Sequence, residues 1–291
     1  MNDKVNLNDD LERFLGDLRE GKAVSMLIAP AAETAFEDLP RLLGYLRSLG
    51  VRGFYPVLPY ADITVWGYYR LLREKPCMQL ICSACVGISG YLREHGGEWA
   101  EYLCPVFSPL LCTARYLRSY RRLSGSLAFL SPCVLKKKEF HTGGEGLIQY
   151  NVTIKALNRW LKNEGIALRQ YERCFPEQDH NGPGLTLAAS GGIGKVLAAL
   201  LPDLACHVEQ GTANALSYLS SSREFGEQKN RPMLFEPYAC PGGCANGSGV
   251  GKRGCRDFLN PAGPVNTGDI FELFTRYDKT LNIRDFCYVN R

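Results

Sequence analysis

The chain has 291 residues, of which 45% are hydrophobic and 22% charged, an ordinary composition for a globular protein with a sizeable core. A formal net charge of +4 without a basic block argues against a nucleic-acid-binding protein. The polar, acidic N-terminus is not a signal peptide, and no apolar run approaches the ~18 residues that cross a bilayer. We therefore expect a cytoplasmic protein without a membrane segment.

Short apolar runs alternate with helical patterns along the chain. The predicted strands are, in order, 24–30, 51–57, 78–82, 126–131, 185–190 and 232–238. The predicted helices are 38–49, 63–74, 151–165 and 193–201. Such alternation is typical of an α/β fold with largely parallel sheets flanked by helices. The loop-like segment 174–184 suggests one domain, 1–291, made of two lobes at approximately 1–180 and 181–291.

Twelve cysteines are many for a chain in a reducing compartment, where structural disulfides are disfavoured. Thiolates are soft ligands that suit iron–sulfur clusters and zinc. Cys77, Cys82 and Cys85 have the C-x4-C-x2-C spacing of a plant-type ferredoxin loop. This spacing overlaps the apolar run MQLIC (78–82), which we predict to be a buried strand, so the ferredoxin interpretation is disfavoured.

Four cysteines come just after predicted strands, in three separate segments: Cys85, Cys133, Cys240 and Cys244. Ligands in open α/β sheets bind outside the carboxyl ends of the strands. The last two cysteines lie in YACPGGCANGSG (238–249), whose glycines let the backbone approach a cofactor closely. The sequence therefore predicts a four-thiolate site for a metal cluster.

Other motif interpretations fit less well. The segment SGGIGKV (190–196) suggests a phosphate loop, but Ala189 stands where a Walker A motif needs glycine. Zinc at Cys240 and Cys244 would call for a second ligand pair nearby. A run of three lysines such as 136–138 is commonly a solvated charged face.

Several segments together resemble the cluster-binding segments of the FeFe-hydrogenase catalytic domain. They are CSACV (82–86), SPCVLKKKE (131–139), LAASGGIGKVL (187–197) and EPYACPGGCANGSG (236–249), with IAPAAE (28–33) and ADIT (61–64) in support. The resemblance covers most of the chain and implies two α/β lobes with an H-cluster between them. That cofactor is a 4Fe–4S cubane joined through a cysteine sulfur to a diiron unit with CO, cyanide and azadithiolate.

The resemblance also implies roles for individual residues. The cubane ligands would be Cys85, Cys133, Cys240 and Cys244, with Cys244 bridging to the diiron unit. Lys136 matches a lysine that hydrogen-bonds a cyanide, and Glu139 would orient it. The remaining expected neighbours of the cofactor are Ala29, Pro30, Ser131, Pro132, Leu187, Gly191 and Tyr238.

The chain departs from the family pattern at the positions that deliver protons. Ala84 stands where the family has a proton-donating cysteine, and alanine carries no exchangeable side-chain proton. The segment 62–69 has Trp66, Gly67 and Tyr68 where relay glutamates are expected. Cys104 falls at the position of a relay serine. We therefore predict that the metal-holding residues are kept while proton delivery is weakened.

Retained metal ligands together with weakened proton delivery favour a slow hydrogenase used for H2 sensing, whose substrates are H2 and protons. We expect a ferredoxin or iron–sulfur domain as electron partner and maturation proteins that insert the diiron unit. One alternative is an efficient hydrogenase with a different proton path through Cys82, Cys104 or Tyr238. The other is an electron-transfer or scaffold module that holds only the 4Fe–4S cubane.

Overall fold

The computed structural model describes residues 9–75, 77–144, 146–177, 189–221, 225, 231–251 and 265–288. The chain divides into two compact units whose segments alternate along the sequence. Unit 1 comprises Met1–Val57, Ala114–His180 and Cys244–Asp257, and unit 2 comprises Leu58–Thr113, Asn181–Gly243 and Phe258–Arg291. The chain passes from unit 1 to unit 2 between residues 180 and 181, at the lobe boundary predicted near residue 180. The other points at which the chain passes between the units were not predicted.

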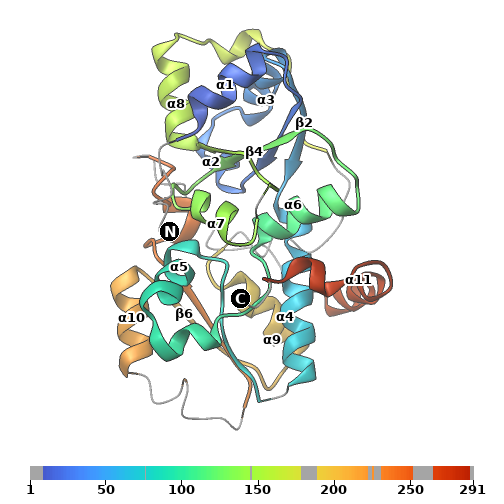
Figure 1. Ribbon diagram of the computed structural model, residues 1–291, viewed down its shortest axis with the longest axis vertical. Coiled ribbons are helices and arrows are strands. Elements are labelled where there is room, and N and C mark those ends of the chain that lie inside the picture. The colour runs from blue at the N-terminus through green and yellow to red at the C-terminus, as the bar shows by residue number, and fades with distance from the viewer. Residues whose placement is uncertain are drawn as a thin grey trace. The chain divides into compact units, whose positions relative to one another are not determined.

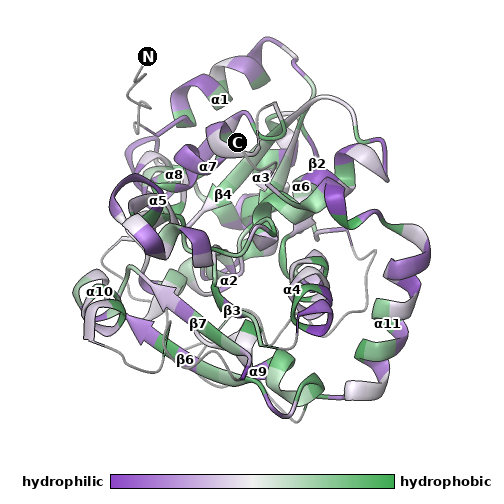
Figure 2. Cartoon of the chain, turned by 60° about the horizontal axis from the view of Figure 1, so that its bottom comes forward, coloured by the Kyte–Doolittle hydropathy of each residue, from purple (hydrophilic) through white to green (hydrophobic). Residues whose placement is uncertain are grey.

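Unit 1 is built on a four-stranded parallel sheet in the order β2-β1-β4-β5. The strands are β1 (Val24–Ile28), β2 (Val51–Pro56), β4 (Ser126–Ser131) and β5 (Tyr150–Thr153). The inner strands β1 and β4 are buried almost throughout, and the apolar strand β4 is green in Figure 2. Burial along a whole strand is typical of a parallel sheet that is covered on both faces.

Helices cover this sheet (Figure 1). They are α1 (Leu11–Arg19), α2 (Ala31–Ala35), α3 (Leu39–Ser48), α7 (Lys136–Thr142) and α8 (Ile154–Asn163), with the 3-10 turn η3 (Leu168–Gln170). Helix α6 (Pro109–Ser119) starts in unit 2 and ends in unit 1. The buried side chains of α1, Leu11, Phe14, Leu15 and Leu18, recur at helical spacing and form one apolar stripe.

The helix predicted over 151–165 is wrong at its start. Residues 150–153 form strand β5, and the helix begins only at Ile154. Thr153 ends the strand and caps the helix, because its Oγ1 accepts a hydrogen bond from Ala156 N at 3.1 Å. The apolar residues of 150–153 match both periodicities, so the pairing with β4 decides in favour of a strand.

Unit 2 contains a three-stranded parallel sheet in the order β3-β7-β6. The strands are β3 (Gln79–Ile81), β6 (Ala205–Gln210) and β7 (Met233–Tyr238). The helices are α4 (Asp62–Glu74), α5 (Val86–His95), α9 (Gly192–Leu200), α10 (Thr212–Ser221) and α11 (Thr267–Thr280). The 3-10 turns are η1 (Leu58–Tyr60), η2 (Gly97–Tyr102) and η6 (Ile283–Phe286), and η5 (Gly243–Asn246) crosses from unit 2 into unit 1.

One strand of unit 2 was missed, and one predicted strand lies mostly outside the described residues. Strand β6 was not predicted, because its residues are only partly buried and include polar side chains. Of the strand predicted over 185–190, only Ala189 and Ser190 lie within the described residues, and these form a turn before α9. The predicted α/β class with parallel sheets and flanking helices is confirmed. Among the residues described, none of the helices combines the length and apolar character needed to span a bilayer.

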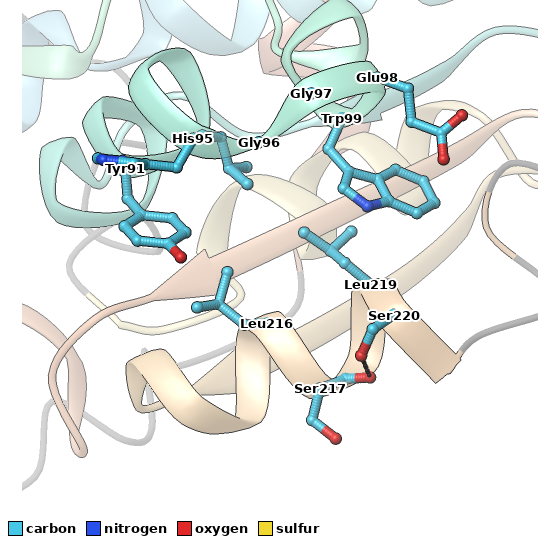
Figure 3. Close-up of a pocket in the computed structure, with 11 residues that line it drawn as sticks. Tyr91, His95, Gly96, Gly97, Glu98, Trp99, Leu216, Ser217, Leu219 and Ser220 are labelled. Atoms are coloured by element: carbon cyan, nitrogen blue, oxygen red, sulfur yellow. Dashed lines mark hydrogen bonds between the residues drawn. The ribbon is translucent and has the colours of Figure 1, made fainter.

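A pocket of about 640 Å³ lies in unit 2 between the end of α5, η2 and α10 (Figure 3). Leu216 and Leu219 of α10 face Tyr91 and Trp99 across it. Its lining includes none of the predicted site residues. The pocket is therefore separate from the predicted metal site within this unit.

Helix α4 is buried on nearly all sides. Trp66 and Tyr68 have no exposed surface, and Gly67 lies against Val106, where a Cβ would be 2.8 Å from Val106 Cγ1. Any larger residue at position 67 would push α4 away from the Val106 segment. Glycine at this position is therefore explained by close packing.

Asp62, in the first turn of α4, is a buried acid. Its side chain is 2% exposed, and Oδ2 has no hydrogen-bond partner among the described residues. Burial penalises the charged form and raises the pKa of Asp62 to about 8. The carboxyl is therefore largely protonated at neutral pH in the folded protein, and it titrates near its ordinary value of about 4 when unfolded.

The raised pKa predicts a pH-dependent loss of stability. A folded-state pKa above the unfolded value gives stability that is fully present below pH 4 and is lost as pH rises to about 8. The free energy of unfolding of Asp62→Asn, relative to that of wild type, should therefore increase steadily from pH 4 to 8. Each unit of pKa shift corresponds to about 1.4 kcal/mol of this difference. Urea unfolding at several pH values measures this difference.

Asp38→Asn is the matched control. Asp38 accepts a hydrogen bond from Arg41 N at 3.2 Å and pairs with Arg173 at 3.0 Å, so its removal should lower stability at neutral pH. A difference between Asp62→Asn and wild type that stays constant from pH 4 to 8 would contradict the buried neutral acid.

Candidate metal centre

The predicted ligands lie at the carboxyl ends of strands in both units. In unit 1, Cys133 follows the end of β4, and Ala29 follows the neighbouring strand β1, where its N–H donates to Leu130 O at 3.2 Å. Pro30 then begins helix α2. Because β1 and β4 are parallel, Ala29, Pro30 and Cys133 share one edge of the sheet.

The loop that carries Cys133 lies directly against the loop that carries Cys244. Gly249 N donates to Pro132 O at 2.8 Å, and Val134 N donates to Ser248 Oγ at 3.2 Å. A Cβ on Gly247 would be 2.2 Å from Pro132 O, which is closer than any real contact. Gly247 and Gly249 are therefore required by this close approach of two backbones.

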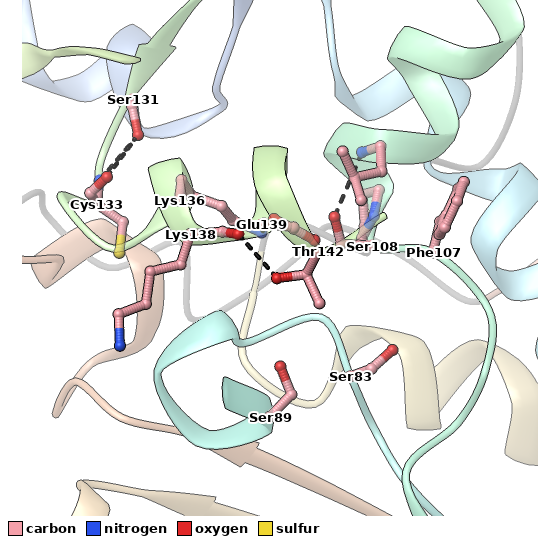
Figure 4. Close-up of polar contacts among 12 residues, drawn as sticks. Ser83, Ser89, Phe107, Ser108, Ser131, Cys133, Lys136, Lys138, Glu139 and Thr142 are labelled. Atoms are coloured by element: carbon pink, nitrogen blue, oxygen red, sulfur yellow. Dashed lines mark hydrogen bonds and ion pairs between the residues drawn. The ribbon is translucent and has the colours of Figure 1, made fainter. Parts of the chain in front are cut away.

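Two polar side chains hold the backbone of Cys133. Ser131 Oγ accepts from Cys133 N at 3.1 Å and donates to Cys133 O at 2.9 Å (Figure 4). Asn151 Nδ2 donates to the same carbonyl at 3.1 Å. Ser131, predicted as a neighbour of the cofactor, therefore fixes the ligand's backbone.

Lys136 and Glu139 form a buried ion pair on the first turn of α7, drawn in Figure 4, with Nζ and Oε2 2.6 Å apart. Burial opposes the charged form of the lysine, but Glu139, followed by Cys244 and Cys133, outweighs this effect and raises the pKa of Lys136. Glu139 Oε1 is buried without a hydrogen-bond partner in the described part of the chain. The solvated-lysine alternative is therefore wrong for Lys136, which is 8% exposed.

Unit 2 carries the other two predicted ligands. Cys85 precedes the first residue of α5, and its Sγ accepts a hydrogen bond from Ala239 N at 3.3 Å. Cys240 follows directly after Ala239, and its carbonyl accepts from Gly243 N at 3.0 Å. The segments of Cys85 and Cys240 therefore meet within unit 2.

Tyr238 and Gly191 belong to a buried network at the start of α9. Tyr238 Oη donates to Glu236 and accepts from Gly191 N at 3.2 Å, and Glu236 Oε2 accepts from Gly194 N at 2.9 Å. Gly191 has a φ of 82°, a backbone conformation that favours glycine. The Tyr238 hydroxyl is thus engaged with protein groups, and contact of Tyr238 or Gly191 with a cofactor stays a prediction.

The predicted relay positions of unit 2 hold a buried cluster of hydroxyl and thiol groups. Tyr68 Oη lies 3.5 Å from Cys82 Sγ and 3.3 Å from Ser83 Oγ, and it accepts from Ser83 N at 2.9 Å. Ser83 Oγ donates to Val106 O at 2.9 Å. Burial raises the pKa of Tyr68 well above 10, followed by the effects of Cys104 and Cys82.

The thiol groups of this cluster are also difficult to ionise. Burial raises the pKa of Cys82 to about 12, and it also raises the pKa of Cys104, which is 1% exposed. Ala84, at the predicted proton-donor position, is half-buried and contributes only a methyl group. The groups at the relay positions therefore hold their protons tightly at neutral pH.

Each unit presents one pair of the four predicted thiolates. No group of three or more histidine, cysteine or acidic side chains in the described residues is close enough to hold a metal ion. The donor set still fits an iron–sulfur cluster, because soft thiolates lie on glycine-rich loops beside a buried cation. Leu187, also predicted as a neighbour of the cofactor, lies outside the described residues.

Sequence reasoning missed two residues at this site. Asp10 bonds to Lys137 of α7 and to the backbone of Asn151, and Asn151 Nδ2 donates to the carbonyl of Cys133. The pair Asp9–Asp10 before an amphipathic run is a helix-start signal that could have drawn attention to Asp10. No pattern marks Asn151, because its role arises from the pairing of β4 with β5.

Comparison with known proteins gives one family. The family model described as "Iron only hydrogenase large subunit, C-terminal domain" matches residues 22–248. A [FeFe]-hydrogenase structure concerned with oxygen inactivation of the H cluster 2Fe subcluster matches with a TM-score of 0.70 and 17% identity, covering 97% of this chain and 98% of that chain.

Two structures of the hydrogenase HydA1 from Chlamydomonas reinhardtii also match. One variant gives a TM-score of 0.69 at 16% identity, and an apo variant gives 0.68 at 18%, each covering 97% of this chain and 98% of that chain. At these identities the structural likeness establishes the fold, while the family match rests on the sequence.

The four-thiolate prediction can be tested by iron content. Cys133→Ser and Cys240→Ser, one from each unit, should lower bound iron to near background after anaerobic reconstitution, and they should lower stability because cluster binding is coupled to folding. Iron and sulfide per chain, with thermal unfolding, measure both effects.

Cys174→Ser and Cys287→Ser are the matched controls, since neither cysteine follows a strand of the site. They should keep nearly wild-type iron. Equal loss of iron from both pairs of variants would mean that the ligands are assigned wrongly.

Proposed function

Because this chain belongs to the family of iron-only hydrogenase large subunits, whose C-terminal domain it matches, we propose that it interconverts H2 with two protons and two electrons, slowly, as an H2 sensor. The proposal rests on a contrast between the metal-binding residues and the proton-relay positions. Cysteine pairs, glycine-rich loops and a buried lysine are present, while the relay positions hold groups that ionise poorly. The first set supports the chemistry, and the second supports slow turnover.

The cofactor of this reaction would be the H-cluster. Cys85, Cys133, Cys240 and Cys244 would hold its cubane, and Cys244 would also bridge to the diiron unit. When bound, the cofactor supplies the iron site at which H2 is cleaved or formed and stores the electrons. The protein's own residues bind it, exclude water from it and deliver protons to it.

Lys136 would balance the negative charge of the cofactor. Its ammonium group is held by Glu139 at 2.6 Å, and both side chains are buried. A charge-assisted hydrogen bond from Lys136 to a cyanide of the diiron unit would be shorter and about twice as strong as a neutral one. We propose that Glu139 keeps the lysine charged and aimed, so that it is ready before the diiron unit arrives.

Slow turnover follows from the groups that replace the relay. A positioned acid or base contributes roughly 10²–10⁴-fold to a proton transfer when its pKa lies near the working pH. Tyr68 and Cys104 are buried with pKa values far above neutral, and Ala84 carries no proton at all. Proton transfer along this side would therefore be slow and would limit the overall rate.

One observation favours the alternative of an efficient enzyme with a different proton path. Tyr68, Cys82 and Ser83 form a continuous line of polar contacts within unit 2. The single phenolic proton can pass to either neighbour, as a relay requires. The raised pKa of Cys82, about 12, argues for slow passage along the same line.

We further propose a ferredoxin or an iron–sulfur domain as the electron partner, and maturation proteins that supply the diiron unit. A similar structure, with a TM-score of 0.61 and 18% identity, concerns stepwise H-cluster assembly in HydA(deltaEFG). We infer stepwise assembly here as well, and we propose that the cubane binds first and the diiron unit follows.

Ala84→Cys tests the sensing proposal. The substitution puts back a thiol with an ordinary pKa of about 8.5, close enough to neutral pH to exchange protons. H2 evolution by fully matured protein with a chemical reductant should rise, but by less than the ~10²–10⁴-fold of a complete acid–base step. Tyr68→Glu in the same protein should raise it further.

Ala167→Cys is the control for an added thiol, because Ala167 is exposed in unit 1. It should leave the rate at the wild-type value. A rate that stays flat in Ala84→Cys, with the cofactor intact, would remove proton delivery as the bottleneck and favour the efficient enzyme.

A further inference from the structure

We propose that the pocket between the end of α5, η2 and α10 is a binding site for an organic cation that carries an aromatic ring (Figure 3). The inference goes beyond the proposed function and does not rest on it. The pocket lies within unit 2 and has a volume of about 640 Å³. Small-molecule sites commonly measure about 300–1,000 Å³, so the pocket has room for a complete ligand of this kind.

The floor of the pocket is apolar. Leu92 and Leu219 line it and are 1% and 2% exposed, because both belong to one buried core cluster of unit 2. Leu216, which also lines the pocket, packs against the same cluster. A ligand that covers this floor gains most from an apolar body, since apolar surface is then removed from water on both sides.

Two aromatic side chains border this floor. Trp99 packs against Tyr102 and Phe225, with ring centroids 5.8 and 6.0 Å apart, so the indole is fixed on its core side. Tyr91 is 42% exposed and stacks on His95, with 5.0 Å between the ring centroids. The face of an aromatic ring is electron-rich and attracts a cation within about 6 Å of its centre. These rings therefore favour a positively charged ligand.

The fixed charge of the pocket has the matching sign. Among the lining residues that the structure describes, Glu98 carries the only fixed charge, and neither lysine nor arginine occurs. Arg93 lies two residues from both Tyr91 and His95, which places it about 200° around α5 from each. Its guanidinium carbon is 4.7 Å from the ring centre of Tyr288. An anionic ligand would thus meet Glu98 without a basic side chain to offset the repulsion.

A ring-bearing quaternary ammonium ion satisfies these features together. Its ring would cover the leucine floor, its charged group would lie against the faces of Trp99 and Tyr91, and the exposed Glu98 would offset its charge. A quaternary nitrogen has no N–H group to keep in water, so contact with aromatic faces costs it less than it costs a primary ammonium group.

The test follows ligand binding in the full chain, labelled with ¹⁵N and reconstituted anaerobically with iron and sulfide. The chain has three tryptophans, whose indole N–H resonances are recorded during titration with benzyltrimethylammonium. The resonance of Trp99, identified by its loss in Trp99→Leu, should shift and saturate. Those of Trp66 and Trp160 should stay in place, because neither residue lines the pocket.

Two further probes separate the contributions of charge and ring. Phenylacetate has the same ring with the opposite charge and should bind about tenfold more weakly than benzyltrimethylammonium. Tetramethylammonium has the charge without the ring and should also bind more weakly, because it leaves the leucine floor uncovered. Isothermal titration calorimetry measures the dissociation constants of all three probes.

Three variants remove the proposed contacts one at a time. Trp99→Leu keeps apolar bulk without the aromatic face and should weaken binding of benzyltrimethylammonium about tenfold. Tyr91→Leu changes an exposed position that the core does not depend on, and it should weaken binding several-fold. Glu98→Gln should weaken binding less and should reduce its dependence on salt.

Phe271→Leu and Glu272→Gln are the matched controls, since both residues are exposed on α11 and do not line the pocket. They should bind benzyltrimethylammonium like wild type. Equal affinities for benzyltrimethylammonium and phenylacetate would overturn the proposal, because they would mean an apolar cavity without a charge preference. A Trp99 resonance that does not move, or equal weakening in Phe271→Leu and Trp99→Leu, would overturn it as well.

Discussion

The close approach of two loops is the constraint on which the unit 1 half of the site depends. The backbone of 247–249 crosses the backbone of 132–134 at hydrogen-bond distance, with Gly249 N bonded to Pro132 O at 2.8 Å. Gly247 and Gly249 have no room for a Cβ there, since an atom added to Gly247 would lie 2.2 Å from Pro132 O. Cys133 and Cys244 are brought together by this crossing, and the placement of Lys136 beside them follows from it.

Charge balance is a second constraint on the unit 1 half of the site. As ligands of a metal cluster, Cys133 and Cys244 would carry negative charge on neighbouring loops, and the buried Lys136 would offset it. The lysine is stable there because Glu139 pairs with it. The next residue of α7, Lys137, pairs with Asp10 at 2.8 Å.

The sequence predicted the parts of the fold that are locally encoded. Strands β1, β4 and β7 are apolar runs, and the cysteines just after strands, together with the glycines near Cys244, mark the site. Strand β5 was merged with the helix that follows, because the two patterns overlap at 151–153. Strand β6 was missed because it is only partly buried. The contacts of Asp10, Asn151 and Tyr68 arise from tertiary packing, which no local pattern reports.

The central claim is that this chain holds a complete H-cluster in a setting that favours detection over turnover. Infrared spectroscopy of fully matured protein, as isolated and under H2, tests it most directly, because CO and cyanide bound to iron absorb where protein does not. The account predicts CO and cyanide bands that shift under H2 while turnover stays low. Matured protein that contains the 4Fe–4S cubane but shows no such bands would contradict it and would favour a scaffold or electron-transfer module.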